Sequence, residues 1–170
     1  MSNKIAQAER IAALCARYQA LFIIDDRADI ARLLGAGVHL GQEDLPPRLA
    51  RRIVGPEAVI GFSTHNAEQL EAAAEEPVDY LALGPIFETS SKERPDPVVG
   101  LERLRAWRRL TERPLVAIGG ITRANAPAVL AAGADSVAVI GDLLADPCSP
   151  ERLRERMEQW QRLVKRQRRA

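Results

Sequence analysis

Short apolar segments alternate with segments rich in Ala, Leu, Glu and Arg along almost the whole chain. The intervening segments, such as AEQLEAAAEE and RANAPAVLAAG, have helical periodicity. Apolar runs without polar alternation are typical of parallel strands covered on both faces, and their alternation with helices predicts βαβ units. Six strands are predicted, each with Gly, Asp or Ser at or next to its end: 21–26, 37–41, 58–63, 80–85, 115–120 and 136–141.

Two segments read as near copies, LLGAGVHLG and LAAGADSVAVIG. In both, a helix is expected to end at Gly and a short turn to lead into the next strand. Six parallel strands of this kind indicate either a (β/α) barrel or an open doubly wound sheet. The periodicity does not separate these two α/β folds.

Composition limits the class of protein further. A chain of 170 residues with 46% hydrophobic residues predicts one domain, residues 1–170, with a single core. The net charge of +1 gives no reason to expect nucleic acid or a membrane surface as partner, and the basic end of the last helix is interpreted as a solvated face. Cys15 and Cys148 have no metal or disulfide spacing, which fits a reducing cytoplasm. No apolar stretch approaches the ~20 residues that a membrane span needs, so no span is expected.

Two glycine-containing turns follow the last two predicted strands, at Gly119–Gly120 and at Ile140–Gly141–Asp142. In barrels of this type the active site lies on the loops after the strands, and phosphate often binds after the last two. Backbone N–H groups just before a helix favour an anion. One such turn would be explained by a positive φ alone. Two of them favour a phosphate site.

Carboxylates end the first two predicted strands. Asp26 and Asp44 are expected at the same mouth, where they could share Mg²⁺, which binds a few carboxylates together with water and phosphate oxygens. The alternative is ordinary structure: Asp26 paired with Arg27, and Asp44 capping the turn before Pro46. The residues themselves leave both interpretations open.

Hydroxyl and cationic side chains follow the predicted strand 80–85. Thr89 and Ser91 offer donors and Lys92 a point charge, which suit phosphate oxygens and favour the metal interpretation. Ser63 supplies a further donor or a helix cap. Neither His39 nor His65 is assigned a proton-transfer role, because single histidines are more often structural.

These motifs together resemble the thiamine-phosphate synthase family. The segments IIDDR, GVHLGQEDLP, GFSTHN, LGPIFETSSK, VAIGGIT and GADSVAVIGDL occur in that family's order from about residue 4 to residue 145. The resemblance implies a TIM barrel that joins hydroxymethylpyrimidine diphosphate to a thiazole phosphate, releasing pyrophosphate and forming thiamine phosphate. It also implies a Mg²⁺ cofactor held by Asp26 and Asp44.

The resemblance assigns the remaining roles residue by residue. Ser63 and Lys92 correspond to contacts with the pyrimidine diphosphate and are the implied catalytic residues. Thr89 and Ser91 correspond to hydroxyls at the thiazole phosphate, beside a backbone cradle in the last two loops. The full substrate-binding set is Asp25, Ser63, Thr89, Ser90, Ser91, Lys92, Gly119, Gly120, Ile140 and Gly141.

The chain departs from the family pattern in three places. Asp25 stands where asparagine is usual, and Gly141 where serine is common. The front of the barrel has no counterpart to two βα units or to the family's Gln-x-Arg-x-Lys segment, in a fold that typically runs to ~250 residues. We therefore expect an incomplete barrel of about six βα units, impaired alone or completed as a homo-oligomer or by another chain.

Two alternative functions stay open beside the synthase. One is a thiazole tautomerase on the same fold, which would need no metal pair. The other is a non-catalytic phosphate-binding module, expected to bind thiazole phosphate without turnover. Fold-level analogy does not choose among these three.

Overall fold

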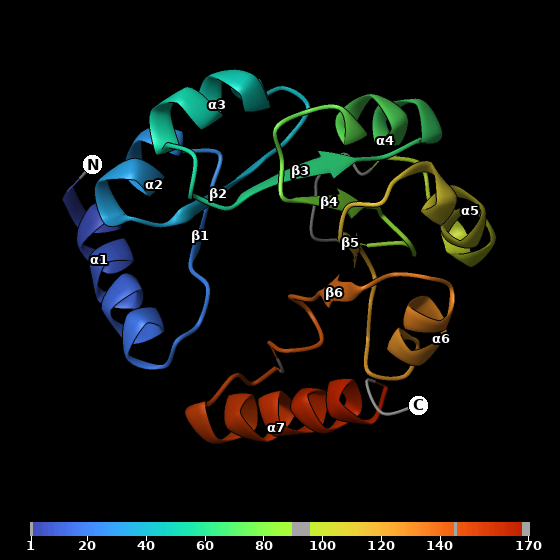
Figure 1. Cartoon of the computed structure of the whole chain (residues 1–170). Coiled ribbons are helices and arrows are strands. Elements are labelled where there is room, and N and C mark those ends of the chain that lie inside the picture. Colours follow the sequence, from blue (N-terminus) through green and yellow to red (C-terminus); the bar gives the residue numbers. More distant parts are fainter. Residues whose placement is uncertain (1, 90–95, 145, 168–170) are drawn as a thin grey trace.

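The computed structural model describes residues 2–89, 96–144 and 146–167. The predicted alternation of strands and helices is present throughout this part of the chain (Figure 1). The strands are β1 (Ile23–Asp25), β2 (Gly37–Leu40), β3 (Ile60–Thr64), β4 (Tyr80–Leu83), β5 (Leu115–Ile118) and β6 (Ser136–Ala138). The helices are α1 (Ser2–Arg17), α2 (Ala28–Leu34), α3 (Pro47–Val54), α4 (Ala67–Ala74), α5 (Gly100–Trp107), the 3₁₀ turn η1 (Arg108–Leu110), α6 (Ala126–Ala131) and α7 (Pro150–Gln167).

The order of the strands separates the two α/β folds that the sequence left open. The six strands pair in parallel in the order β1-β2-β3-β4-β5-β6, the same as their order in the chain. A doubly wound sheet reverses its strand order at a switch point, whereas a barrel adds each strand beside the previous one. The fold is therefore the expected incomplete (β/α) barrel, with β1 and β6 as the two edges of the described sheet.

Helix ends are set by local chemistry that can be read in the sequence. Gly35 ends α2 in the left-handed region at φ 61°, as expected for the helix before β2. The Asn66 side chain caps α4 by accepting a hydrogen bond of 2.8 Å from the N–H of Gln69. Pro47 occupies the first turn of α3, where its missing N–H leaves no helical bond unmade.

The two faces of the sheet differ in burial. On the face covered by helices, Leu40, Leu81 and Leu115 are fully buried. On the opposite face, where the interior of a barrel would lie, His39 and Tyr80 are only partly buried. Coverage of both faces, expected from the apolar runs, is thus complete on one face only, because six strands curve without closing (Figure 1).

Helices α1 and α7 lie at the two ends of the sheet, beside its first and last strands (Figure 1). Residues 2–17 form the helix that the sequence predicts before the first strand. Helix α7 carries the basic C-terminal segment and buries Trp160. Of the helices formed by the described residues, none is both long and apolar enough to cross a membrane.

Candidate functional site

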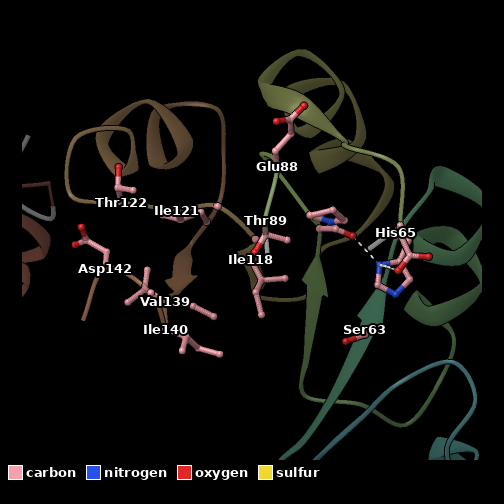
Figure 2. A pocket seen from close by; sticks show the side chains of 17 residues that line it. Ser63, His65, Glu88, Thr89, Ile118, Ile121, Thr122, Val139, Ile140 and Asp142 are labelled. Carbon is pink, nitrogen blue, oxygen red and sulfur yellow. Dashed lines mark hydrogen bonds and ion pairs between the residues drawn. The ribbon is translucent and has the colours of Figure 1, made fainter. Parts of the chain in front are cut away.

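A pocket of about 490 Å³ opens at the carboxyl ends of β3 to β6 (Figure 2). Such a volume suits a small phosphorylated molecule. Its walls come from the loops that follow these four strands, which is where catalytic groups of barrel enzymes lie. Six of the residues predicted for substrate binding line it: Ser63, Thr89, Gly119, Gly120, Ile140 and Gly141.

Part of the predicted site falls on the loop after β4. Thr89 lies at the pocket wall (Figure 2). Ser90, Ser91 and Lys92 lie outside the described residues, so their assignments remain predictions from the sequence.

The glycine pair after β5 is required by the backbone. Gly119 and Gly120 have φ values of 93° and 64°, a region that residues with a Cβ rarely adopt. A Cβ on Gly120 would also overlap the carbonyl oxygen of Glu88 and the side chain of Phe87. The positive φ values therefore explain both glycines at this turn, without any role in phosphate binding.

The same turn also presents donors to the pocket. The N–H groups of Gly120 and Gly141 donate no hydrogen bond to another described residue, although both residues line the pocket. The side chain of Asn125 fixes the first turn by donating to the Gly120 carbonyl oxygen (3.0 Å) and accepting from the Thr122 N–H (2.8 Å). The backbone requirement and an anion-binding role are thus compatible.

A polar network that sequence reasoning missed holds the loop after β6. Asp142 accepts hydrogen bonds from Arg123 Nε (2.7 Å) and Trp160 Nε1 (2.9 Å). Arg156 donates to the Asp142 carbonyl oxygen (2.6 Å). Helix α7 thereby fixes the position of Gly141, immediately before Asp142. No local sequence signal links these residues, because the contacts join distant segments.

The carboxylates lie at the ends of β1 and β2, outside the residues that line the pocket. Asp26 has φ 62°, an uncommon conformation for a residue with a side chain. Burial, the charge of Asp25, and hydrogen bonding and charge from Asp44 raise the pKa of Asp26 above its ordinary value. Two carboxyl groups this close favour sharing a proton or a cation.

The donor set of this carboxylate pair fits Mg²⁺. Asp26 and Asp44 supply hard oxygen ligands, and magnesium completes its shell with water and phosphate oxygens. Asp44 is held in place because its Oδ2 accepts a hydrogen bond of 2.6 Å from the Gly41 N–H. Within the described part of the chain, no cluster of three or more His, Cys, Asp or Glu side chains is arranged to hold a metal.

Of the two ordinary interpretations of these aspartates, the structure contradicts the one for Asp26 and agrees with the one for Asp44. Arg27 pairs with Asp29, at 2.8 Å from Nε to Oδ1, and this pairing lowers the pKa of Asp29 to about 2. Asp44 does not cap α3, but its Oδ2 accepts from the Gly41 N–H within the turn that precedes Pro46, so its turn-capping role is present. The structural role considered for Asp26 is therefore absent, whereas Asp44 both caps its turn and lies beside Asp26.

The end of β3 and the residues after it contribute two pocket residues and two structural ones. Thr64 is buried and its hydroxyl donates to the Ala82 carbonyl oxygen at 2.9 Å. Asn66, and not Ser63 or Thr64, caps the following helix. His65 lines the pocket, and its Nδ1 lies 2.6 Å from the Gly84 carbonyl oxygen (Figure 2). Ser63 also lines the pocket, and its Oγ lies 2.9 Å from Nε2 of His39.

Fold and site together define an α/β-barrel protein with a pocket and a carboxylate pair at the carboxyl end of its sheet. The family description "Thiamine monophosphate synthase" matches residues 2–143. The chain therefore belongs to the thiamine monophosphate synthase family, as the sequence motifs predict.

Relatives with this name are similar over most of the chain. It is 64% identical over 126 residues to the thiamine-phosphate synthase of Koribacter versatilis, covering 74% of this chain and 60% of that protein. It is 42% identical over 158 residues to the enzyme of Synechococcus sp. (strain CC9605), covering 92% and 45%. The thiamine phosphate pyrophosphorylase structure from Pyrococcus furiosus superposes with a TM-score of 0.85 at 35% identity, over 98% of this chain and 78% of that one. The chain thus spans between about half and four fifths of the length of these three relatives.

Proposed function

We propose that this chain acts in thiamine phosphate synthesis, joining hydroxymethylpyrimidine diphosphate to thiazole phosphate with release of pyrophosphate. One observation carries the proposal: the pocket that gathers Ser63, Gly120 and Gly141 lies at the same end of the sheet as the Asp26 and Asp44 pair. An anion cradle and a hard-cation site at one mouth suit a reaction between two phosphorylated molecules.

The proposed site divides between the two substrates. The thiazole phosphate is held by Thr89 and the N–H groups of Gly120 and Gly141. The diphosphate is held by Ser63 and Lys92, with Asp26 and Asp44 placing Mg²⁺ beside it. These small molecules are the proposed partners, and a cytoplasmic location is part of the same proposal.

The reaction needs no side-chain nucleophile. The bond from the pyrimidine methylene carbon to the diphosphate oxygen breaks, and its electron pair leaves on pyrophosphate. The thiazole nitrogen donates its lone pair to that carbon and forms the new C–N bond. Magnesium, when bound, would supply charge neutralisation at the leaving group. The chain's own residues anchor both phosphates and so align the nitrogen with the carbon.

The proposal is tested by incubating the purified chain with both substrates, with and without magnesium. We expect thiamine phosphate to form only with magnesium, and more slowly than with a relative that spans the whole barrel. Thiazole phosphate binding without product would support the non-catalytic module instead. Product formation that is indifferent to magnesium would contradict the role given to Asp26 and Asp44.

One observation favours the thiazole tautomerase as a second candidate. Because a carbonyl oxygen only accepts, the 2.6 Å contact of His65 Nδ1 with Gly84 places the proton of a neutral ring on Nδ1. His65 Nε2 is then an acceptor at the pocket wall, where it could move a proton. Isomerisation of the thiazole carboxylate phosphate, lost in a His65→Gln variant, would establish this activity.

The open edges of the sheet support completion by further strands, and we propose that a second copy supplies them. Beside β1, Tyr18 and Leu21 are 69% and 66% exposed, and after β6, Ile140 and Leu144 are 59% and 55% exposed. Unpaired edges with apolar side chains favour association. Light scattering is expected to give a mass above the 18.7 kDa of one chain. A monodisperse monomer would contradict this.

A further inference from the structure

Three polar side chains from neighbouring strands form a hydrogen-bonded chain on the barrel-facing side of the sheet. Tyr80 of β4 places its hydroxyl oxygen 2.9 Å from Nδ1 of His39 in β2. The other ring nitrogen of His39, Nε2, lies 2.9 Å from Oγ of Ser63 in β3. Ser63 is the member that lines the pocket, so this series of hydrogen bonds leads from the partly buried side of the sheet to the pocket.

A glycine makes this contact possible. In the sheet register, Gly61 of β3 lies between His39 and Tyr80, paired with each of them. A Cβ at this position would overlap the Tyr80 hydroxyl and the His39 ring. Without it, the two rings stack across the strand at a centroid distance of 5.5 Å and an interplanar angle of 26°. The pair is therefore built into the sheet.

The protonation states give the hydrogen-bonded chain a direction. Burial, with the charge of Asp25, raises the pKa of Tyr80 to about 12, so its hydroxyl keeps its proton. Both ring nitrogens of His39 have hydroxyl partners, Tyr80 and Ser63, each of which can either donate or accept, so a neutral ring satisfies both contacts. A neutral imidazole has one donor nitrogen and one acceptor nitrogen.

The direction of each hydrogen bond follows from the partners. Among the described residues, His39 is the one hydrogen-bond partner of the Tyr80 hydroxyl, which is best satisfied by donating to Nδ1. The proton of His39 then lies on Nε2 and is donated to the Ser63 oxygen. With its oxygen accepting there, the Ser63 hydroxyl can donate its own proton toward the pocket. The Ser63 backbone is held by Gln42, whose Nε2 donates to the Ser63 carbonyl oxygen at 2.5 Å.

We propose that Tyr80 and His39 are positioning residues that fix the Ser63 hydroxyl as a donor to an anionic oxygen of the substrate. The inference rests on the proposed function, in which that oxygen belongs to the diphosphate. A hydroxyl stabilises an anion only when it donates a hydrogen bond to it. A donor that is already oriented toward the anion has no free-energy cost of reorientation. Tyr80 and His39 act through Ser63 and need not touch the substrate.

The first test is the tautomer of His39, which depends on no activity. The chain contains two histidines, so a His65→Gln variant assigns both ring signals in a long-range ¹H–¹⁵N spectrum. We expect a neutral His39 with its proton on Nε2, and a loss of this preference in Tyr80→Phe. A proton on Nδ1 in the unaltered chain would overturn the inference.

The second test is a double-mutant cycle read with magnesium pyrophosphate as the probe. Tyr80→Phe is expected to weaken pyrophosphate binding about 3- to 10-fold, as for the loss of one hydrogen bond. Because Tyr80 acts through Ser63, the same change in a Ser63→Ala background should have almost no further effect. Tyr18→Phe is the matched control, since Tyr18 is exposed, precedes β1 and does not line the pocket, and it should leave binding unchanged.

The outcomes separate this inference from the proposed function. Additive effects of Tyr80→Phe and Ser63→Ala would overturn the inference even if thiamine phosphate is formed. The expected tautomer and coupling in a chain that makes no thiamine phosphate would support the inference and count against the synthase. A chain that binds no pyrophosphate and shows the proton of His39 on Nδ1 would overturn both.

Discussion

Replacing Asp26 with asparagine is expected to raise the stability of the chain without magnesium and to remove the stabilisation that magnesium gives. Burial, together with the neighbouring Asp25 and Asp44, disfavours the charged form of Asp26, and a neutral amide avoids this cost. Asparagine also tolerates the left-handed backbone conformation observed at φ 62°. Because the side chain is exposed, we expect a gain of only ~0.5 kcal/mol.

The pH dependence of this gain follows from the raised pKa. Between the unfolded and the folded pKa of Asp26, the folded chain binds more protons than the unfolded chain, so stability falls as pH rises through this window. The loss persists at neutral pH. The Asn variant lacks this group, so its advantage should be present at pH 7 and absent below the unfolded value, near pH 3.8.

With magnesium present, we expect the unaltered chain to be more stable than the Asp26→Asn variant. A cation bound by Asp26 and Asp44 stabilises the folded state by mass action, and the loss of one ligand should weaken binding by about 100-fold or more. Thermal unfolding with and without magnesium chloride and pyrophosphate measures both effects. Asp29→Asn is the matched control, because Asp29 pairs with Arg27 and should leave the response to magnesium unchanged. Equal responses of the Asp26 and Asp29 variants would rule out the metal pair.

Alanine substitutions at Gly120 and Gly141 are expected to differ sharply in stability, although both glycines line the pocket. Gly120→Ala forces a Cβ into a backbone at φ 64° and against the carbonyl oxygen of Glu88. The strained conformation and the overlap together should cost about 2–4 kcal/mol. At Gly141 an added Cβ meets no atom within 4 Å, so the change should be about 0.5 kcal/mol or less.

Urea unfolding followed by tryptophan fluorescence would measure this difference, since Trp107 and Trp160 are the two tryptophans in the chain. Gly141→Ser extends the comparison. Its effect on stability should be as small as that of Gly141→Ala. It adds a hydroxyl donor where members of the family commonly have serine. Equal destabilisation at the two glycines would mean that the loop after β6 is packed more tightly than the structure indicates.

The sequence was sufficient for the features that depend on local chemistry. Apolar runs with Gly, Asp or Ser at or next to their ends located the six strands formed by the described residues, because parallel strands packed under helices need continuous apolar residues. Gly35 was correctly expected at a helix end, where the left-handed conformation favours glycine. The residue types at the strand ends also predict anion and cation binding, which stays a prediction from the sequence.

The tertiary structure decided which of these residues meet. Periodicity is a short-range signal, so it left the barrel and the doubly wound sheet unresolved until the strand order was known. His39 and Tyr80 are 41 positions apart and meet because the register places Gly61 between them. Asp142 and Trp160 meet only because α7 packs beside α6 and against the loop after β6. The sequence by itself determined the elements and their chemistry, whereas the long-range register and packing of those elements determined the site.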